Sequence, residues 1–141
     1  MKAAAAAARD AASSLGLEPP LVIAVTVLTS LDDDDLAAVG QQTPASSQVV
    51  TLAKLAQACG LDGVVCSAKE LGEIRKACGP EFVTVVPGIR PAGSAVGDQK
   101  RVMTPPDAIA AGATSLVIGR PITQAEDPAK AARDIMASLP K

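Results

Sequence analysis

The chain has 141 residues, a mass of 14.1 kDa, a formal net charge of −2 and 48% hydrophobic residues, which suits one domain with a buried core. It has no basic stretch, and its aromatic residues amount to a single Phe, so the charge and the stacking surfaces of a nucleic-acid-binding protein are missing. Three cysteines and no histidine fit neither an even disulfide framework nor a zinc site, and we expect a reducing, cytoplasmic setting.

The first segment, MKAAAAAARDAASS, predicts a helix that ends near Gly16. Alanine is the best helix former, and the charged residues Arg9 and Asp10 argue against a signal peptide. The apolar run Leu21–Leu28 predicts a strand that is covered on both faces. No apolar run in the sequence approaches the length of a membrane span.

Four consecutive aspartates, Asp32–Asp35, follow this strand. Ser30 and Asp33 have the spacing of a capping box, and the aspartates would lie in a first helical turn, where the helix dipole favours negative charge. Clustered carboxylates can bind metal ions. Consecutive side chains point in different directions, however, so we predict a helix start and no metal site.

Strand and helix patterns then alternate to the end of the chain. Apolar spacing predicts a helix that stops at Gly60, Ser67 and Glu70 predict a capping box before the next helix, and Thr104 predicts an N-cap before a short helix ending at Gly112. The further strands are expected at Gly63–Cys66, Phe82–Val86 and Ser115–Ile118, and the last helix runs from Asp127 to about Leu139.

This order predicts a single α/β domain over residues 1–141, with a leading helix and about four parallel strands, each followed by a helix. A closed (β/α)₈ barrel needs eight strands, so the sequence predicts half of a TIM barrel. We expect inner faces that carry Val25, Val27, Val64, Val83 or their neighbours to be left uncovered. The chain should therefore associate with itself or with a complementary half-barrel, or else be poorly soluble through the same exposed surface.

Two of the predicted strands end in similar loops, PGIRPAGS and IGRPIT. Arg90 and Arg120 stand just past the carboxyl ends of these strands, where parallel α/β folds place ligands. Together with the Gln99 amide and the Gly119 N–H they could surround a phosphate. The first loop lacks the lysine of a P-loop, and no GxGxxG opens a helix. A solvated surface role for both arginines is the alternative.

Catalytic machinery is not evident in the sequence. There is no histidine and no nucleophile elbow, and Lys54, Lys69, Lys76 and Lys130 fall on predicted helices, where they would be solvated. The chain is expected to hold a substrate without transforming it.

The segments LVIAVTVLTS, GLDGVVCS, VVPGIRPAGSAVGDQKRVMTP and LVIGRPITQAEDP resemble, in order and spacing, the carboxyl-terminal half of bacterial orotidine 5′-phosphate decarboxylases. The resemblance implies a (β/α)₈ barrel, usually dimeric. It also implies conversion of orotidine 5′-monophosphate to uridine 5′-monophosphate and CO₂ in pyrimidine biosynthesis, without metal or organic cofactor.

The same resemblance implies roles for individual residues. Thr29 would contact the edge of the pyrimidine, and Gln99 would bridge phosphate and base. Arg90, Gly119 and Arg120 would be phosphate ligands. The loop from Arg90 to Arg101 resembles the lid that closes over the phosphate in this family.

The family's D-x-K-x-x-D motif of catalytic Lys and Asp residues has no counterpart here. Met1–Ser13 resembles the helix after the family's fourth strand, so the resemblance implies that the chain begins just past the catalytic residues and has none of its own. Ala113–Leu116 also departs from the family, which commonly has an Asp and an aromatic residue before the last strand.

Three interpretations of the sequence remain open. The first is a decarboxylase fragment, from a truncated gene, a split enzyme or an incomplete gene model. The second is a sister sugar-phosphate decarboxylase or isomerase of the same superfamily, against which GDQ followed by IGRPIT argues. The third is a non-catalytic half-barrel that binds a phosphate or a nucleotide, or merely oligomerises.

Overall fold

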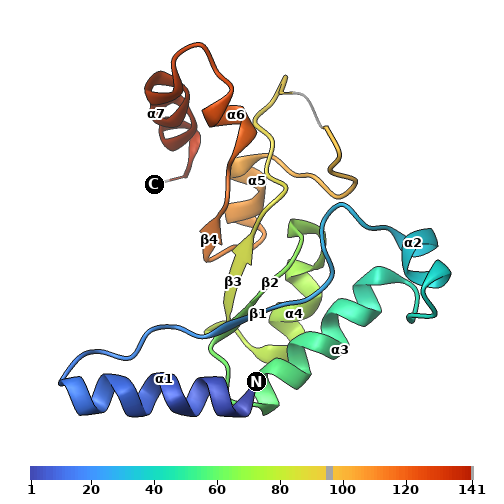
Figure 1. Ribbon diagram of the computed structural model, residues 1–141. Coiled ribbons are helices and arrows are strands. Elements are labelled where there is room, and N and C mark those ends of the chain that lie inside the picture. The colour runs from blue at the N-terminus through green and yellow to red at the C-terminus, as the bar shows by residue number, and fades with distance from the viewer. Residues whose placement is uncertain (95–96, 141) are drawn as a thin grey trace.

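The computed structural model describes residues 1–94 and 97–140. Within these residues the strands form one four-stranded parallel sheet in the order β1-β2-β3-β4 (Figure 1). The strands are β1 (Ile23–Val25), β2 (Gly63–Val65), β3 (Val83–Val86) and β4 (Ser115–Leu116). The helices are α1 (Lys2–Leu15), α2 (Asp33–Ala38), α3 (Ala45–Ala58), α4 (Leu71–Cys78), α5 (Pro105–Ala110), α6 (Arg120–Thr123) and α7 (Pro128–Ser138), and a 3₁₀ turn spans Ala68–Glu70. The predicted α/β alternation with parallel strands is confirmed.

Several element boundaries differ from the prediction. β1 has three residues instead of the eight of the apolar run, because it pairs only over Ile23–Val25 with the equally short β2. β4 is likewise shorter than expected. The short helix α6 was not predicted, and it makes Arg120 the first residue of a helix instead of a loop residue. α1 ends as predicted, with Gly16 in the left-handed region at φ 65°.

Two capping predictions had different outcomes. The capping box of Ser67 and Glu70 is present at the 3₁₀ turn, where the Ser67 N–H donates to Glu70 Oε2 at 2.9 Å. The predicted pair of Ser30 and Asp33 is wrong. Asp32 is the N-cap of α2, and the Asp35 N–H donates to Asp32 Oδ1 at 3.1 Å. Each aspartate of the run has a suitable side chain for this position, so spacing alone could not select the cap.

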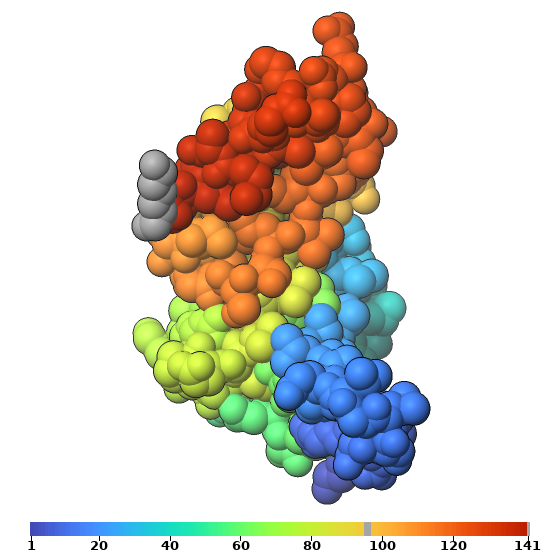
Figure 2. Space-filling view, turned by 90° about the vertical axis from the view of Figure 1, so that its left-hand side faces the viewer, coloured from blue at the N-terminus to red at the C-terminus, as the bar shows by residue number. Residues whose placement is uncertain are grey.

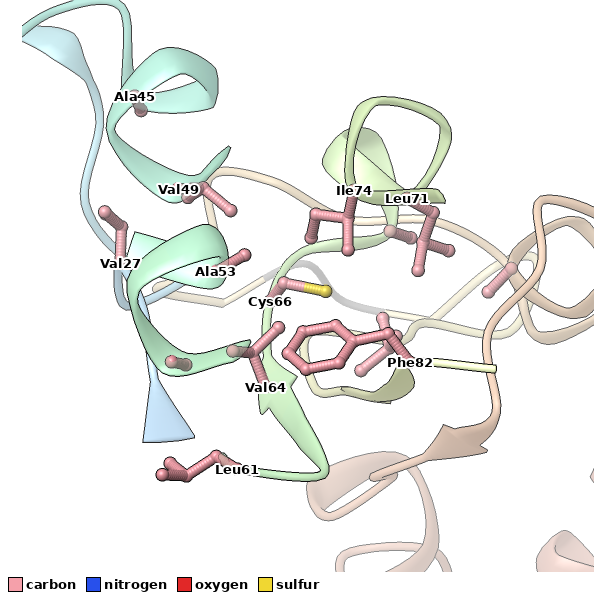
Figure 3. Packing of buried hydrophobic residues seen from close by; sticks show 14 of the residues in the cluster. Val27, Ala45, Val49, Ala53, Leu61, Val64, Cys66, Leu71, Ile74 and Phe82 are labelled. Carbon is pink, nitrogen blue, oxygen red and sulfur yellow. The ribbon is translucent and has the colours of Figure 1, made fainter. Parts of the chain in front are cut away.

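The core lies between the sheet and the helices α3 and α4. Residues that pair in register point to the same side of the sheet, and Ala24, Val64 and Thr84 share the helix-covered face. Figure 3 shows Val49 and Ala53 of α3 beside Val64 and Cys66. The side chains of Val64 and Cys66 are fully buried. Burial raises the pKa of the Cys66 thiol to about 12, so this cysteine is part of the core and not a nucleophile.

The opposite face of the sheet is open. Val25, Val65 and Val85 pair across it, and Val25 and Val117 remain 59% and 50% exposed. α1 and α7 lie at opposite ends of the molecule (Figures 1 and 2). Val27 and Val64 are buried with the helices, so on β2 the open face carries the neighbour of Val64, Val65. Val25 and Val83 lie on the open face, as expected.

We expect the isolated chain to self-associate through this open face. Exposed apolar surface and the sheet edges at β1 and β4 favour pairing with another chain. Sedimentation equilibrium should show dimers or larger species at roughly micromolar concentration, which an interface of standard size supports. Val25→Lys should weaken the association, whereas Leu55→Lys, on the exposed side of α3, should not. A monomer with cooperative unfolding at that concentration would contradict this expectation.

Arg75 of α4 holds the amino-terminal side of the sheet together. Its guanidinium donates to Pro80 O at 2.8 Å, to Gly112 O at 2.6 Å and to Thr84 Oγ1 at 2.9 Å. It also donates to Phe82 O. One side chain thus satisfies acceptors on the segments that lead into β3 and β4.

Arg75→Ala should lower the free energy of unfolding by about 2–4 kcal/mol, because several carbonyls would lose a charged donor. Arg75→Lys should recover less than half of this loss, since an ammonium group cannot reproduce the planar fork. Urea unfolding at unchanged m-value measures both. A loss below about 0.5 kcal/mol for the alanine variant, the range of ordinary surface changes, would contradict the assignment.

Within the described ranges, every helix is too short or too polar to cross a bilayer.

Candidate functional site

The candidate site lies at the carboxyl ends of the parallel strands. The segments after β1, β3 and β4 all leave the sheet at this edge, which is where α/β folds bind ligands. Four of the predicted site residues, Thr29, Arg90, Gly119 and Arg120, follow these strand ends, and Gln99 lies on the long segment between β3 and α5. Ala95 and Val96, part of the loop from Arg90 to Arg101, lie outside the described residues.

Thr29 and Gln99 are in direct contact. The Thr29 hydroxyl donates to Gln99 Oε1, and the backbone N–H groups of Lys100 and Arg101 donate to Thr29 O at 3.2 and 3.3 Å. Gly88 lies beneath this pair at φ 73°, and a Cβ there would lie 3.1 Å from Gln99 Oε1. A side chain at position 88 would therefore be strained and would press on Gln99.

Arg120 contacts the same long segment from the other side. Its guanidinium donates to Asp98 Oδ1 and lies against Gly97, where a Cβ would be 2.9 Å from Nη1. The Arg120 guanidinium holds the pKa of the Asp98 carboxyl below its usual value. Arg120 lines a pocket of about 280 Å³ together with Ser94, Gly97, Pro121, Gln124 and Ala125. Arg120 is the one charged side chain among the described residues that line this pocket, so an anion bound there would compete with Asp98 for its guanidinium.

Arg90 is placed differently from Arg120. Its side chain is buried, its N–H donates to Met103 O at 3.0 Å, and its Nη1 donates to Ile89 O at 2.8 Å. Among the described residues, Arg90 does not line the pocket that contains Arg120. The structure therefore brings Thr29 to Gln99 and Arg120 to the preceding residue, Asp98, whereas it places Arg90 inside the loop.

The aspartate run is paired with a lysine. Lys100 Nζ lies 2.7 Å from Asp32 Oδ2 and 2.8 Å from Asp35 Oδ2. The hydrogen bond from Lys100 lowers the pKa of Asp32 to about 2, and the two carboxylates raise the pKa of Lys100. These exposed contacts tie the segment after Gln99 to the start of α2.

No local pattern in the sequence singles out Arg101. It was one of several charged residues in the loop, and Glu70 was identified only as a capping residue. In the structure both side chains are buried, and Arg101 Nη1 lies 2.5 Å from Glu70 Oε1. The only sequence signal was an arginine directly after the GDQK segment.

Comparison with known proteins identifies the family. Residues 1–135 match the family model described as "Orotidine 5′-phosphate decarboxylase / HUMPS family". The chain is 56% identical over 140 residues to an orotidine 5′-phosphate decarboxylase of Moorella thermoacetica, covering 99% of this chain and 56% of that protein. It is 54% identical over 134 residues to an orotidine 5′-phosphate decarboxylase of Salmonella gallinarum, covering 95% of this chain and 55% of that protein.

Solved structures agree with this result. An orotidine 5′-phosphate decarboxylase from Lactobacillus acidophilus matches with a TM-score of 0.73 and 38% identity, over 89% of this chain and 52% of that one. One from Sulfolobus solfataricus matches with a TM-score of 0.58 at 20% identity and supports the fold alone. The chain spans about half the length of the curated relatives it matches, in agreement with a half-barrel. The chain belongs to the orotidine 5′-phosphate decarboxylase / HUMPS family.

Proposed function

We propose that this chain supplies the phosphate- and pyrimidine-binding half of an orotidine 5′-phosphate decarboxylase, which converts orotidine 5′-monophosphate to uridine 5′-monophosphate and CO₂. The observation that carries the proposal is the position of one segment, 97–101. It touches Thr29 beyond β1 and Arg120 beyond β4, so it spans the edge of the sheet on which a nucleotide would lie.

Each residue of the site has a role in this proposal. Thr29 contacts the edge of the pyrimidine, and Gln99 bridges the base and the phosphate. Arg120 and Gly119 bind phosphate oxygens. The resemblance also makes Arg90 a phosphate ligand, a role that requires its buried guanidinium to leave the carbonyl of Ile89. Phosphate oxygens would replace the Asp98 carboxylate as the partner of Arg120, because they offer a stronger and more highly charged set of acceptors.

The chemistry of this half is binding. Closure of the loop from Arg90 to Arg101 over the phosphate would use interactions remote from the reacting ring to stabilise the transition state. The Lys and Asp groups that the family uses for decarboxylation and proton transfer would come from a complementary half-barrel packed on the open face of the sheet. We propose this complementary half, or a second copy of the chain, as the protein partner, and the cytoplasm as the location.

Isothermal titration calorimetry with uridine 5′-monophosphate and with uridine tests the proposal. We expect the chain to bind the monophosphate at least about 30-fold more tightly, because a charge-assisted contact to phosphate contributes about 2 kcal/mol or more. Uridine reports the pyrimidine contacts alone. Equal affinities for the two compounds, or binding of ribose 5-phosphate as tightly as the nucleotide, would refute the nucleotide site and would favour a sugar-phosphate or a purely structural role.

A further inference from the structure

Arg101 contacts several segments that lie far from it in the sequence. Its Nη1 lies 2.5 Å from Glu70 Oε1, and its Nη2 donates to Val27 O at 3.0 Å and to Leu28 O at 2.9 Å. Its own carbonyl accepts from Ser67 Oγ at 3.3 Å. The side chains of Arg101 and Glu70 are only 9% and 3% exposed, so water does not compete for these bonds.

These contacts join the parts that carry the candidate site. Val27 and Leu28 directly precede Thr29, and Ser67 and Glu70 follow β2. Arg101 itself lies two residues after Gln99, and its carbonyl lies 3.3 Å from the position of a Cβ on Gly88. One side chain therefore fixes the end of β1 relative to the end of β2 and to the segment that presents Gln99.

We infer that Arg101, held by Glu70, is a positioning residue that sets Thr29 and Gln99 at the separation needed to bind the nucleotide. The identity of the ligand rests on the proposed function, whereas the placement of the segment 97–101 by Arg101 does not. Arg101 acts through Thr29 and Gln99 and need not touch the ligand.

Stability alone does not account for such a pair. A buried ion pair loses much of its attraction to the cost of removing both charges from water, and apolar residues of similar volume often serve stability as well or better. Burial raises the pKa of Glu70, although Arg101 and the Ser67 N–H act to lower it. What apolar side chains cannot do is donate to the two carbonyls that precede Thr29.

Arg75 provides a matched control. It is also an arginine that donates to several carbonyls, but it does so near Gly79–Phe82 and Gly112, at the amino-terminal side of β3 and β4. Changes at Arg75 should lower stability without altering the relation between Thr29 and Gln99.

The test compares the unchanged chain with Arg101→Lys, with the double variant Arg101→Met/Glu70→Leu, and with Arg75→Lys. The double variant replaces the ion pair by apolar side chains, so it is designed to fold while the bonds to Val27 and Leu28 are lost. Two quantities are measured: hydrogen exchange of the Lys100 and Arg101 amides relative to the Cys66 amide, and the ratio of the uridine Kd to the uridine 5′-monophosphate Kd. The Kd ratio does not depend on the fraction of folded chain. The exchange ratio is compared at matched global stability, which is set with urea, because the sheet amide of Cys66 reports global opening and the loop amides report local opening.

In the double variant the Lys100 and Arg101 amides should exchange about tenfold faster relative to Cys66, and the Kd ratio should fall about tenfold, the size of one charge-assisted bond. Arg101→Lys should partly restore the exchange ratio and the Kd ratio, because lysine can pair with Glu70 but cannot donate to the carbonyls of Val27 and Leu28 together. Arg75→Lys should change neither ratio.

A double variant that is folded and keeps both ratios would overturn the inference, as would equal changes in Arg75→Lys. If the unchanged chain itself shows no preference for the monophosphate, the proposed function fails. The exchange measurement then decides alone whether Arg101 holds the segment: unchanged exchange overturns the inference, and faster exchange supports the placement of Gln99.

Discussion

The isolated 141-residue chain is expected to show no measurable decarboxylation of orotidine 5′-monophosphate. The sequence contains no D-x-K-x-x-D segment, and the resemblance assigns proton delivery and the charged groups at the reacting carbon to that motif. Positioning a substrate without these groups leaves most of the barrier in place. Release of labelled CO₂ from carboxyl-labelled substrate measures the rate directly.

The same preparation must bind uridine 5′-monophosphate, so that a lack of turnover is not mistaken for a lack of folded protein. Turnover within about a hundredfold of the typical enzyme value of 10 s⁻¹ would contradict the expectation. It would mean that this half-barrel carries catalytic groups of its own.

Arg120→Ala should reduce kcat/KM roughly 30-fold to 1,000-fold in an enzyme assembled from this chain and an amino-terminal half. This reduction corresponds to a loss of about 2–4 kcal/mol of transition-state stabilisation. The reason is the loss of a guanidinium that contacts phosphate in a pocket of about 280 Å³. Arg120→Lys should recover only part of the loss, because an ammonium group cannot bind the phosphate bidentately.

The control for Arg120 is Lys130→Ala. Lys130 forms an exposed i,i+4 pair with Asp134 at 2.6 Å, and its removal should leave kcat/KM unchanged. The decisive comparison uses orotidine, which lacks the phosphate. If Arg120→Ala lowered the rates for orotidine and for orotidine 5′-monophosphate equally, Arg120 would act through folding and not as a phosphate ligand.

Local signals predicted much of the fold. The left-handed Gly16, the capping box of Ser67 and Glu70 and the alternation of strands with helices each depend on a few neighbouring residues, and all are present. The choice of Ser30 as a cap failed because Asp32 competes for the same role with equal chemistry.

The faces of the strands could not be predicted in the same way. A continuous apolar run does not reveal which side the helices will cover, and a shift of one residue reverses the side of every residue. The sequence therefore left open whether Val64 or one of its neighbours faces the open side, and the register places Val64 under α3. The length of β1 likewise depends on its partner β2, which lies about 40 residues away along the chain.

The site was predictable in part. Arg90, Gly119 and Arg120 were predicted from where the strands end, and the Gln99 amide from the long loop after the third strand, whereas the role of Thr29 followed from the resemblance. The contacts that hold the site together were not predictable, because Arg101 and Glu70 are separated by 31 residues and the local pattern at Glu70 indicates only its capping bond with Ser67. Only the folded chain brings the end of β1, the 3₁₀ turn after β2 and the segment after Gln99 into contact.

Complementation decides whether this chain acts as the binding half of a decarboxylase. The Moorella thermoacetica relative is 56% identical to this chain over the region that they share. Its amino-terminal half would be mixed with this chain and assayed with orotidine 5′-monophosphate. We predict that neither half is active alone and that the mixture releases CO₂ at a rate that saturates with added chain and falls with Arg120→Ala. A stable complex of the two halves that binds uridine 5′-monophosphate no better than uridine and releases no CO₂ would contradict the claim.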